Sequence, residues 1–182
     1  FGAAWPEPPA ADLERIRNPG DFVGVNYYSR GLVRAEPAAR PLGAVRISPE
    51  GAPRTSMDWE VYPEGLTEIL LWLRERYGSP PLYITENGAA FEDPPPAAGE
   101  VADPDRMAYL RCHLNAARAA IAQGVDLRGY FVWSLLDNFE WAQGYDKRFG
   151  LVQLDPRTRA RTAKSSAHFY REVIHTNGAN LL

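Results

Sequence analysis

Three short apolar runs alternate with longer stretches in which apolar residues recur every three or four positions. The runs are residues 22–29, 81–86 and 129–136. β-branched and aromatic side chains are frequent in them and helical spacing is absent, so they predict three buried strands. The stretches that follow each run predict amphipathic helices.

The limits of these helices are predicted from capping residues. The first starts with Pro63 and ends before Gly78, which suits the position after a helix end. The second has Asp103 as N-cap and ends at Gly124, and a third is predicted over residues 162–175. On the first two helices the apolar positions that share a face are Leu66, Ile69, Leu70, Leu73 and Tyr77, then Met107, Leu110, Leu114, Ala117 and Ile121.

The remaining segments carry no sustained period. Residues 1–20 are predicted to form a loop with a short helical turn at 12–16, and residues 92–100 a Pro-rich loop. Residues 31–60 and 137–161 are predicted as long loops. Loops of this length are uncommon in a compact domain and are often functional.

The order strand–helix, repeated three times, predicts an α/β protein with a parallel sheet covered by helices. In such folds the C-terminal ends of the strands carry the ligand site. No Gly-rich phosphate-binding turn follows any of the three runs. The sequence therefore favours a barrel over a nucleotide-binding open sheet.

Composition narrows the functional classes. The 182 residues correspond to one domain or part of one, and the first residue is Phe1, which indicates a processed product or a piece of a longer chain. The net charge of −3 makes nucleic acid a poor partner. The single Cys112 excludes an internal disulfide framework and a multi-cysteine zinc site. No apolar run has the length of a membrane span, and no secretory leader opens the chain.

Polar and aromatic side chains lie at the predicted strand ends. Asn26 and Tyr28 close the first run, and residues two positions apart in a strand point the same way. Glu86 closes the second run. Trp133 lies in the third run, and the loop after it contains Asp137, Asn138, Glu140 and Trp141.

A carboxylate surrounded by an amide, a phenol, indoles and a second carboxylate suits a sugar, because these groups bind hydroxyls and stack on a pyranose ring. The same carboxylate could attack an anomeric carbon. Each residue also has a structural explanation. Glu86 could end a strand before a turn, and Trp133 could belong to the core. The residues by themselves favour a carbohydrate-active barrel without deciding the matter.

At these positions the sequence resembles glycoside hydrolase family 1, the group of β-glucosidases and β-galactosidases. The segment Ile84-Thr-Glu-Asn-Gly88 is similar to the nucleophile motif of the family, and residues 22–29 resemble its sixth barrel strand. Residues 57–66 resemble the segment before its sixth helix, and residues 129–152 its eighth strand and glycone-binding loop. The resemblance implies that residues 1–182 are the C-terminal portion, about strands six to eight, of a TIM (β/α)8 barrel.

The resemblance also implies roles. Glu86 would be the nucleophile of a retaining mechanism with a covalent glycosyl-enzyme intermediate, and Tyr28 would support it by a hydrogen bond. The substrate-binding residues implied are Asn26 near the sugar, Trp133 beneath the glycone ring, Glu140 and Trp141 at its hydroxyls, Phe149 near its sixth carbon and Trp59 at the aglycone entrance. The substrates would be β-glucosides or related β-glycosides, with glucose and galactose both open. No metal and no cofactor is implied.

One departure from the family bears on activity. A retaining glycosidase needs a second carboxyl group about 5–5.5 Å from the nucleophile as acid and base. In the family it lies in an Asn-Glu-Pro motif, and this chain contains none. We therefore expect the chain alone to be unstable or aggregation-prone and inactive on ordinary glucosides, with the missing N-terminal part of the barrel as its partner.

Two other functions stay open. A non-catalytic, lectin-like barrel remnant would use the same aromatic and carboxylate set, and an unrelated open-sheet enzyme would need another nucleophile. His113, His168 and His175 show no metal-ligand spacing and are interpreted as packing or surface residues. The absence of cysteine pairs and of a leader predicts a cytoplasmic protein.

Overall fold

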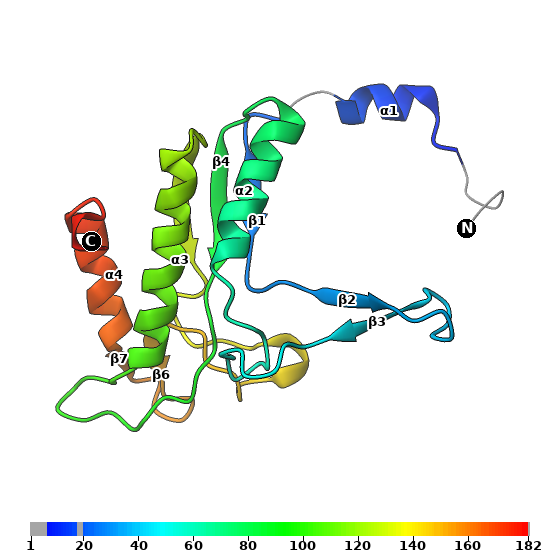
Figure 1. Ribbon diagram of the computed structural model, residues 1–182. Helices are drawn as coiled ribbons and strands as arrows, with labels where there is room; N and C mark the ends of the chain where they lie inside the picture. Colours follow the sequence, from blue (N-terminus) through cyan, green and yellow to red (C-terminus); the bar gives the residue numbers. More distant parts are fainter. Residues whose placement is uncertain (1–6, 18–19, 182) are drawn as a thin grey trace.

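The computed structural model describes residues 7–17 and 20–181 (Figure 1). Residues 1–6 and 18–19 of the predicted N-terminal loop lie outside the described residues, whereas the predicted turn at 12–16 lies within a helix. The elements in chain order are α1 (Ala10–Arg17), β1 (Val23–Asn26), β2 (Leu32–Ala35), β3 (Ala44–Ile47), α2 (Glu64–Tyr77), β4 (Leu82–Asn87), α3 (Pro104–Ala122), β5 (Leu127–Val132), the 3-10 helix η2 (Trp141–Gln143), β6 (Val152–Leu154), β7 (Arg161–Ala163), α4 (Ser165–His175) and the 3-10 helix η3 (Ala179–Leu181).

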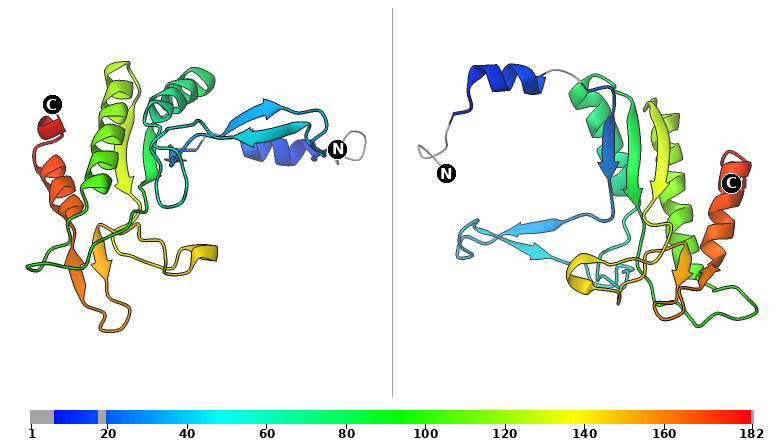
Figure 2. Two further views of the ribbon diagram at one scale, coloured as in Figure 1. Left: turned by 60° about the horizontal axis from the view of Figure 1, so that its bottom comes forward. Right: turned by 180° about the vertical axis from the view of Figure 1, so that it is seen from behind.

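The central feature is a three-stranded parallel sheet in the order β1-β4-β5. Helices α2, α3 and α4 stand side by side on one face of it (Figures 1 and 2). This arrangement confirms the predicted α/β fold with parallel strands. In the described part of the chain β1 and β5 pair only with β4, so both outer strands keep one free edge. The described residues contain no helix long and apolar enough to cross a membrane.

The core lies between the sheet and the helices. Val25 of β1 and Leu82 and Ile84 of β4 are buried on this face. They pack against buried residues of the helices, namely Leu66, Leu70, Ala116, Ala117 and Ala120. Burying a large aliphatic side chain stabilises a fold by about 1.5–3 kcal/mol, so this layer holds the strands to the helices. Two positions of the predicted helix faces lie outside it, since Tyr77 and Ile121 are 59% and 49% exposed.

The opposite face of the sheet carries no covering layer in the described part of the chain (Figure 2, right). Gly24, Asn26, Thr85 and Phe131 are exposed there, because successive strand residues point to opposite faces. Phe131 is 57% exposed. The candidate site residues at the strand ends lie at the edge of this open face.

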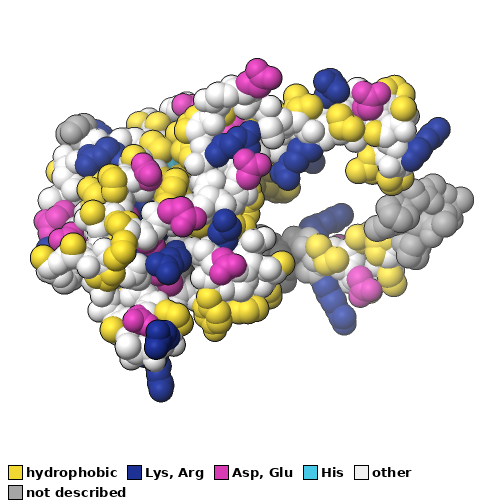
Figure 3. All heavy atoms as spheres, turned by 90° about the horizontal axis from the view of Figure 1, so that it is seen from below, with side chains coloured by type: hydrophobic (Ala, Val, Ile, Leu, Met, Phe, Trp, Pro, Cys, Tyr) yellow, Lys and Arg dark blue, Asp and Glu magenta, His cyan; other side chains and the backbone are white. Residues whose placement is uncertain are grey.

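Several predicted boundaries were wrong. The third strand is β5, which ends at Val132, so Trp133 follows the strand. Residues 31–60 contain the antiparallel hairpin β2–β3, which projects from the body as an arm with basic side chains (Figures 1 and 3). Residues 137–161 contain η2 and β6, which pairs with β7. These strands have only three or four residues and little burial, and so show no apolar alternation.

The predicted ends of α2 and α3 are correct to within about two residues, whereas α4 begins at Ser165 and the predicted helical residues 162–163 belong to β7. The capping chemistry differs from the prediction in one case. Pro63 precedes α2 as its N-cap, and Gly78 follows it in the left-handed region with φ 73°. Asp103 precedes α3, yet its side chain makes no capping hydrogen bond to α3 in the described part of the chain. Its carboxylate instead accepts hydrogen bonds from Arg106 and from the backbone N–H and hydroxyl of Ser166, in the first turn of α4. Asp103 therefore joins two helices rather than ending one.

A buried network of charged side chains connects the loops below the sheet. Arg106 bridges Asp103 and Asp93 at 2.5 and 2.9 Å, and all three side chains are almost fully buried. Lys164 bridges Asp93 and Asp137 at 2.6 and 3.0 Å. Because buried charges are tolerated only when they are paired, removing one member leaves others unbalanced.

Replacing Lys164 with Met is expected to lower the free energy of unfolding by about 3–5 kcal/mol, because Asp137 loses its cation and Asp93 keeps only its pair with Arg106. Urea unfolding followed by circular dichroism measures the change. The matched control is Arg171→Gln, which removes an exposed pair with Glu172 and should cost about 1 kcal/mol or less. Equal losses in the two variants would contradict a structural role for the network.

Candidate active site

The centre of the site is a hydrogen bond between two strand ends. Tyr28 lies two residues beyond β1, and its hydroxyl donates to Oε2 of Glu86 at 2.7 Å. Glu86 is the fifth residue of β4, and the pairing of β4 shifts register around it on both sides. Such irregularities re-aim side chains and are common beside active sites. Here the shift leaves the Glu86 carboxylate half-buried and facing Tyr28.

The surroundings keep Tyr28 protonated. Burial, the hydrogen bond to Glu86 and the negative charges of Glu86 and Glu140 raise the pKa of the Tyr28 phenol far above its usual value. The phenol is therefore a donor throughout the physiological pH range, and Glu86 is its acceptor. Because Glu140 contributes to this rise in pKa, its carboxylate lies within electrostatic reach of Tyr28.

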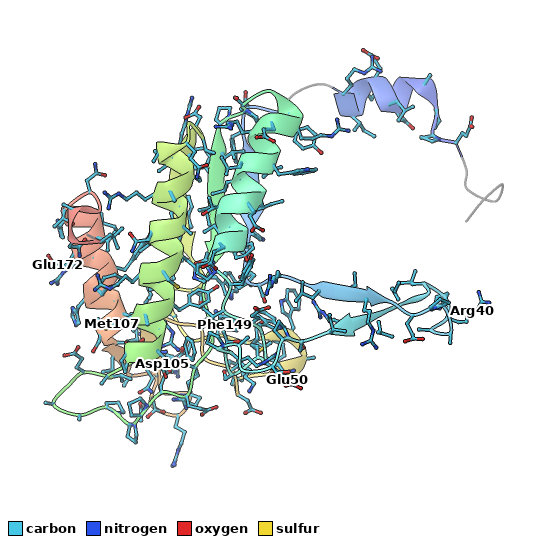
Figure 4. All side chains as sticks on the ribbon, viewed as in Figure 1. Arg40, Glu50, Asp105, Met107, Phe149 and Glu172 are labelled. Atoms are coloured by element: carbon cyan, nitrogen blue, oxygen red, sulfur yellow. The ribbon has the colours of Figure 1, made fainter. Side chains whose placement is uncertain are left out.

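Aromatic rings surround this hydrogen bond. The Tyr28 ring packs edge-on against Trp59 at 5.4 Å and against Phe149 at 6.2 Å between centroids. Trp59 and Phe149 lie 6.1 Å apart. Phe149 is buried and lies between the lower ends of the helices and the base of the hairpin (Figure 4). Three rings from distant parts of the sequence thus form one wall beside Glu86.

The other predicted residues differ in how closely they approach this wall. Asn26 accepts a hydrogen bond from the Thr85 hydroxyl at 2.6 Å and lines a cavity together with Tyr28 and Trp59. Trp133 follows β5, and its backbone N–H donates to the carbonyl of Asn87, next to Glu86. A Cβ at Gly88 would overlap the Trp133 carbonyl, so this approach requires glycine.

The loop after β5 carries the remaining candidates. Glu140 is half-buried, and Trp141 is 82% exposed at the start of η2 with a left-handed φ of 42°. Asp137 was a sequence candidate, but it binds Lys164 and the backbone N–H of Gly150 and belongs to the buried charged network. Asn138 likewise donates within its own loop, to the Ser134 hydroxyl.

Sequence reasoning missed a buried polar cluster behind Glu86, formed by Asn87, Tyr109 and Tyr130. The Asn87 amide donates to the carbonyl of Tyr27 at 2.7 Å and to the Tyr109 hydroxyl at 3.1 Å. Tyr109 in turn donates to the carbonyl of Tyr28 at 3.2 Å, and the Tyr130 hydroxyl donates to Oδ1 of Asn87. The cluster fixes the ends of β1, β4 and β5 relative to one another. An Asn-Gly pair after a strand is typical of a turn, and no other sequence signal identified this role.

His113 lies beneath this cluster. Its ring is fully buried, stacks on Tyr109 at 3.9 Å and places Nδ1 2.8 Å from the Tyr109 carbonyl. Among the residues that the structure describes, Nε2 has no hydrogen-bond partner. Burial lowers the pKa of His113 to about 4, so the ring is neutral at pH 7. Among residues 7–17 and 20–181 no group of three or more His, Cys, Asp or Glu side chains could hold a metal ion.

Comparison with known proteins identifies the family. The sequence model of glycosyl hydrolase family 1 matches residues 3–179. The chain belongs to this family. Beta-glucosidase A of Thermotoga maritima is 48% identical over 173 residues, which cover 95% of this chain and 38% of that relative. Thermostable beta-glucosidase B of Thermobispora bispora is 49% identical, with coverage of 93% and 36%.

Solved structures of family 1 agree with this assignment. The family 1 β-glucosidase from Thermotoga maritima superposes with a TM-score of 0.88 at 48% identity, covering 92% of this chain and 38% of that one. The same enzyme in complex with deoxynojirimycin also gives 0.88. The family 1 chain described here thus spans little more than a third of the length of the relatives it matches. Its parallel sheet and helices form part of a TIM barrel, as the sequence predicted.

The buried His113 makes the stability of this family 1 chain pH-dependent. The pKa is lower in the folded state, at about 4, than in the unfolded chain, at about 6.5, so the unfolded chain binds more protons between these values. The stabilising contribution of neutral His113 to the free energy of unfolding is fully present above pH 6.5. This contribution, about 3 kcal/mol, is lost as the pH falls from 6.5 to about 4.

His113→Leu is expected to flatten the pH dependence of the unfolding free energy between about pH 6.5 and pH 4. Urea unfolding at a series of pH values measures this slope. His168→Gln is the control, because His168 is exposed on α4 and should leave the slope unchanged. A wild-type slope in the His113 variant would contradict the buried neutral state.

Proposed function

We propose that this chain carries the nucleophile side of a retaining β-glycosidase that acts on terminal β-linked glucose or galactose. The observation that carries the proposal is the hydrogen bond from Tyr28 to Glu86 at the end of a parallel strand, beside an aromatic wall. Membership of family 1 and β-glucosidase relatives with 48% and 49% identity support it. A lone surface glutamate would need neither a half-buried phenol as partner nor a fixed strand end.

In the proposed mechanism an Oε atom of Glu86 attacks the anomeric carbon while the bond to the aglycone oxygen breaks. A glycosyl ester with Glu86 forms. Water then attacks the same carbon, gives one proton to a base group and releases the Glu86 carboxylate. Tyr28 donates to one carboxylate oxygen, which orients the carboxylate for attack. The departing oxygen needs a proton from an acid group, and the sequence contains no Asn-Glu-Pro motif to supply it. We therefore place the acid/base carboxylate outside this chain.

The remaining residues are proposed to bind the sugar. The indole of Trp133 would support the apolar face of the ring, since its backbone is tied beside Glu86. Carboxylates and amides suit hydroxyl groups, and rings suit the carbon skeleton. On this basis the proposed glycone contacts are Asn26, Glu140, Trp141 and Phe149, with Trp59 facing the aglycone.

A dinitrophenyl fluoroglucoside tests the nucleophile directly. Its leaving group needs little protonation, and the fluorine beside the anomeric carbon slows hydrolysis of the ester, so an adduct should accumulate even without an acid group. Peptide mass spectrometry of the folded chain is expected to find one adduct, on Glu86. Glu86→Gln should abolish it, whereas Glu100→Gln, at a surface carboxylate that binds Ser165, should not.

Labelling of any other residue would contradict the assignment of Glu86. A folded chain that binds glucose but forms no adduct would favour the alternative, a non-catalytic carbohydrate-binding barrel remnant. Circular dichroism of the same samples establishes that they are folded.

Tyr28→Phe is expected to slow adduct formation about 10- to 100-fold, because a hydrogen bond to a charged group contributes about 1.5–3 kcal/mol. The rate is measured by intact-protein mass spectrometry over time. Tyr62→Phe is the matched control, since Tyr62 also donates to a glutamate, Glu68, but on the surface. An unchanged rate of adduct formation in the Tyr28 variant would contradict the proposed supporting role of Tyr28.

A further inference from the structure

A cavity of about 630 Å³ opens beside the Tyr28–Glu86 pair. Tyr28 and Asn26 form its end near the proposed nucleophile, the base of the β2–β3 hairpin forms one side, and residues 54–60 form the other. A sugar bound at Glu86 would direct its aglycone toward a space that adjoins Tyr28. The chemistry of the cavity walls therefore bears on which aglycones fit.

The walls contain an excess of positive charge. Three guanidinium groups, those of Arg30, Arg46 and Arg54, face two carboxylates, those of Asp58 and Glu60. Both carboxylates are already engaged. Glu60 accepts two hydrogen bonds of 2.9 Å from Arg30, and Asp58 pairs with Arg54 at 3.1 Å. In the part of the chain that the structure describes, Arg46 has no ion-pair partner.

Arg46 is held over the cavity by the shape of the hairpin. It lies on β3 opposite Val33 of β2, and its guanidinium rests against Gly31 at the start of the hairpin. A Cβ at Gly31 would stand 3.3 Å from Nη2 of Arg46, closer than most such contacts. The bare glycine leaves room for the guanidinium to lie along the cavity wall. Its donors have no carboxylate partner among the described residues, because Glu60 and Asp58 pair with Arg30 and Arg54 instead.

The same cavity has apolar and aromatic walls. The side chains that provide them are Trp59, Tyr28, Met57, Leu32 and Ile47. An unpaired guanidinium next to such a surface suits a flat ring with a carboxylate. Guanidinium binds carboxylate through two parallel hydrogen bonds, and indole and phenol rings stack on or pack against aromatic groups.

We propose that this cavity binds the aglycone and that Arg46 selects aromatic aglycones with a carboxylate group. The proposal rests on the proposed function, since Glu86 defines where the sugar lies. Arg30 and Arg54 act as structural cations, held by Glu60 and Asp58, and Arg46 is the residue that determines specificity.

The test compares two ligands that differ in one charge, para-carboxyphenyl β-glucoside and its methyl ester. Binding to the folded chain is measured by quenching of tryptophan fluorescence, with Trp59 in the cavity wall. The acid is expected to bind about 3- to 10-fold more tightly than the ester at low salt, which corresponds to about 0.7–1.4 kcal/mol. Added salt should reduce the difference in affinity between the acid and the ester, because the Arg46 side chain is exposed and its charge is screened.

Arg46→Gln is expected to remove the preference and to leave the affinity for the ester unchanged. Arg34→Gln is the matched control on the same hairpin, because Arg34 pairs with Glu36 and does not line the cavity. Equal affinities for acid and ester in the unchanged chain, a preference that persists in the Arg46 variant, or no binding of either ligand to the folded chain would overturn the proposal.

The adduct on Glu86 separates this proposal from the proposed function. If Glu86 is labelled and the acid and the ester bind equally well, the selection of carboxylate aglycones by Arg46 is overturned and the proposed function stands. A preference that depends on Arg46 without any labelling would support a carboxylate-binding cavity and overturn the glycosidase.

Discussion

The geometry of this site depends on one buried amide. The Asn87 side chain uses both its oxygen and its nitrogen, binding Tyr130 from β5, Tyr109 from α3 and the carbonyl of Tyr27 after β1. Three strand ends are thereby fixed around the residue next to Glu86. Apolar packing alone could hold the strands to the helices and still let their ends slide, because hydrophobic contact is not directional. Directed hydrogen bonds in a dry interior set the distance between Tyr28 and Glu86.

A second constraint acts on the loops beyond the strands. Arg106 donates to the carbonyls of Ala89 and Arg148, so one guanidinium ties the segment after Glu86 to the segment before Phe149. Desolvating these charges is costly, and replacing such a network with apolar residues is often neutral for stability. In this chain the charged network fixes the positions of the loops. The paired charges give the long loops a defined path to the aromatic wall.

The sequence predicted correctly those strands and helices whose buried residues form a regular pattern along the chain. Parallel strands end at one edge, so two apolar runs with a helix between them predicted that the strand ends carrying Tyr28 and Glu86 converge. The hydrogen bond between the two side chains was implied by the family resemblance. The β2–β3 hairpin and the β6–β7 pair were not predicted, because their strands are short and mostly exposed. Asn87 was interpreted as a turn residue and Asp103 as a helix cap. Their partners, Tyr109 and Ser166, lie 22 and 63 residues away, and no local pattern reports such contacts.

The segment after β1, in which Tyr28 binds Glu86, also leads directly into the hairpin that forms the cavity wall. Tyr27 fixes this segment between the two. Its backbone N–H donates to the carbonyl of Glu86 at 2.9 Å, and its hydroxyl donates to the carbonyl of Tyr62 at 2.5 Å. The chain is thus anchored on both sides before it reaches Arg30. Gly65 permits this anchor, because a Cβ there would overlap the Tyr27 hydroxyl. Changes in the hairpin can therefore alter the cavity wall without moving the carboxylate at the strand end.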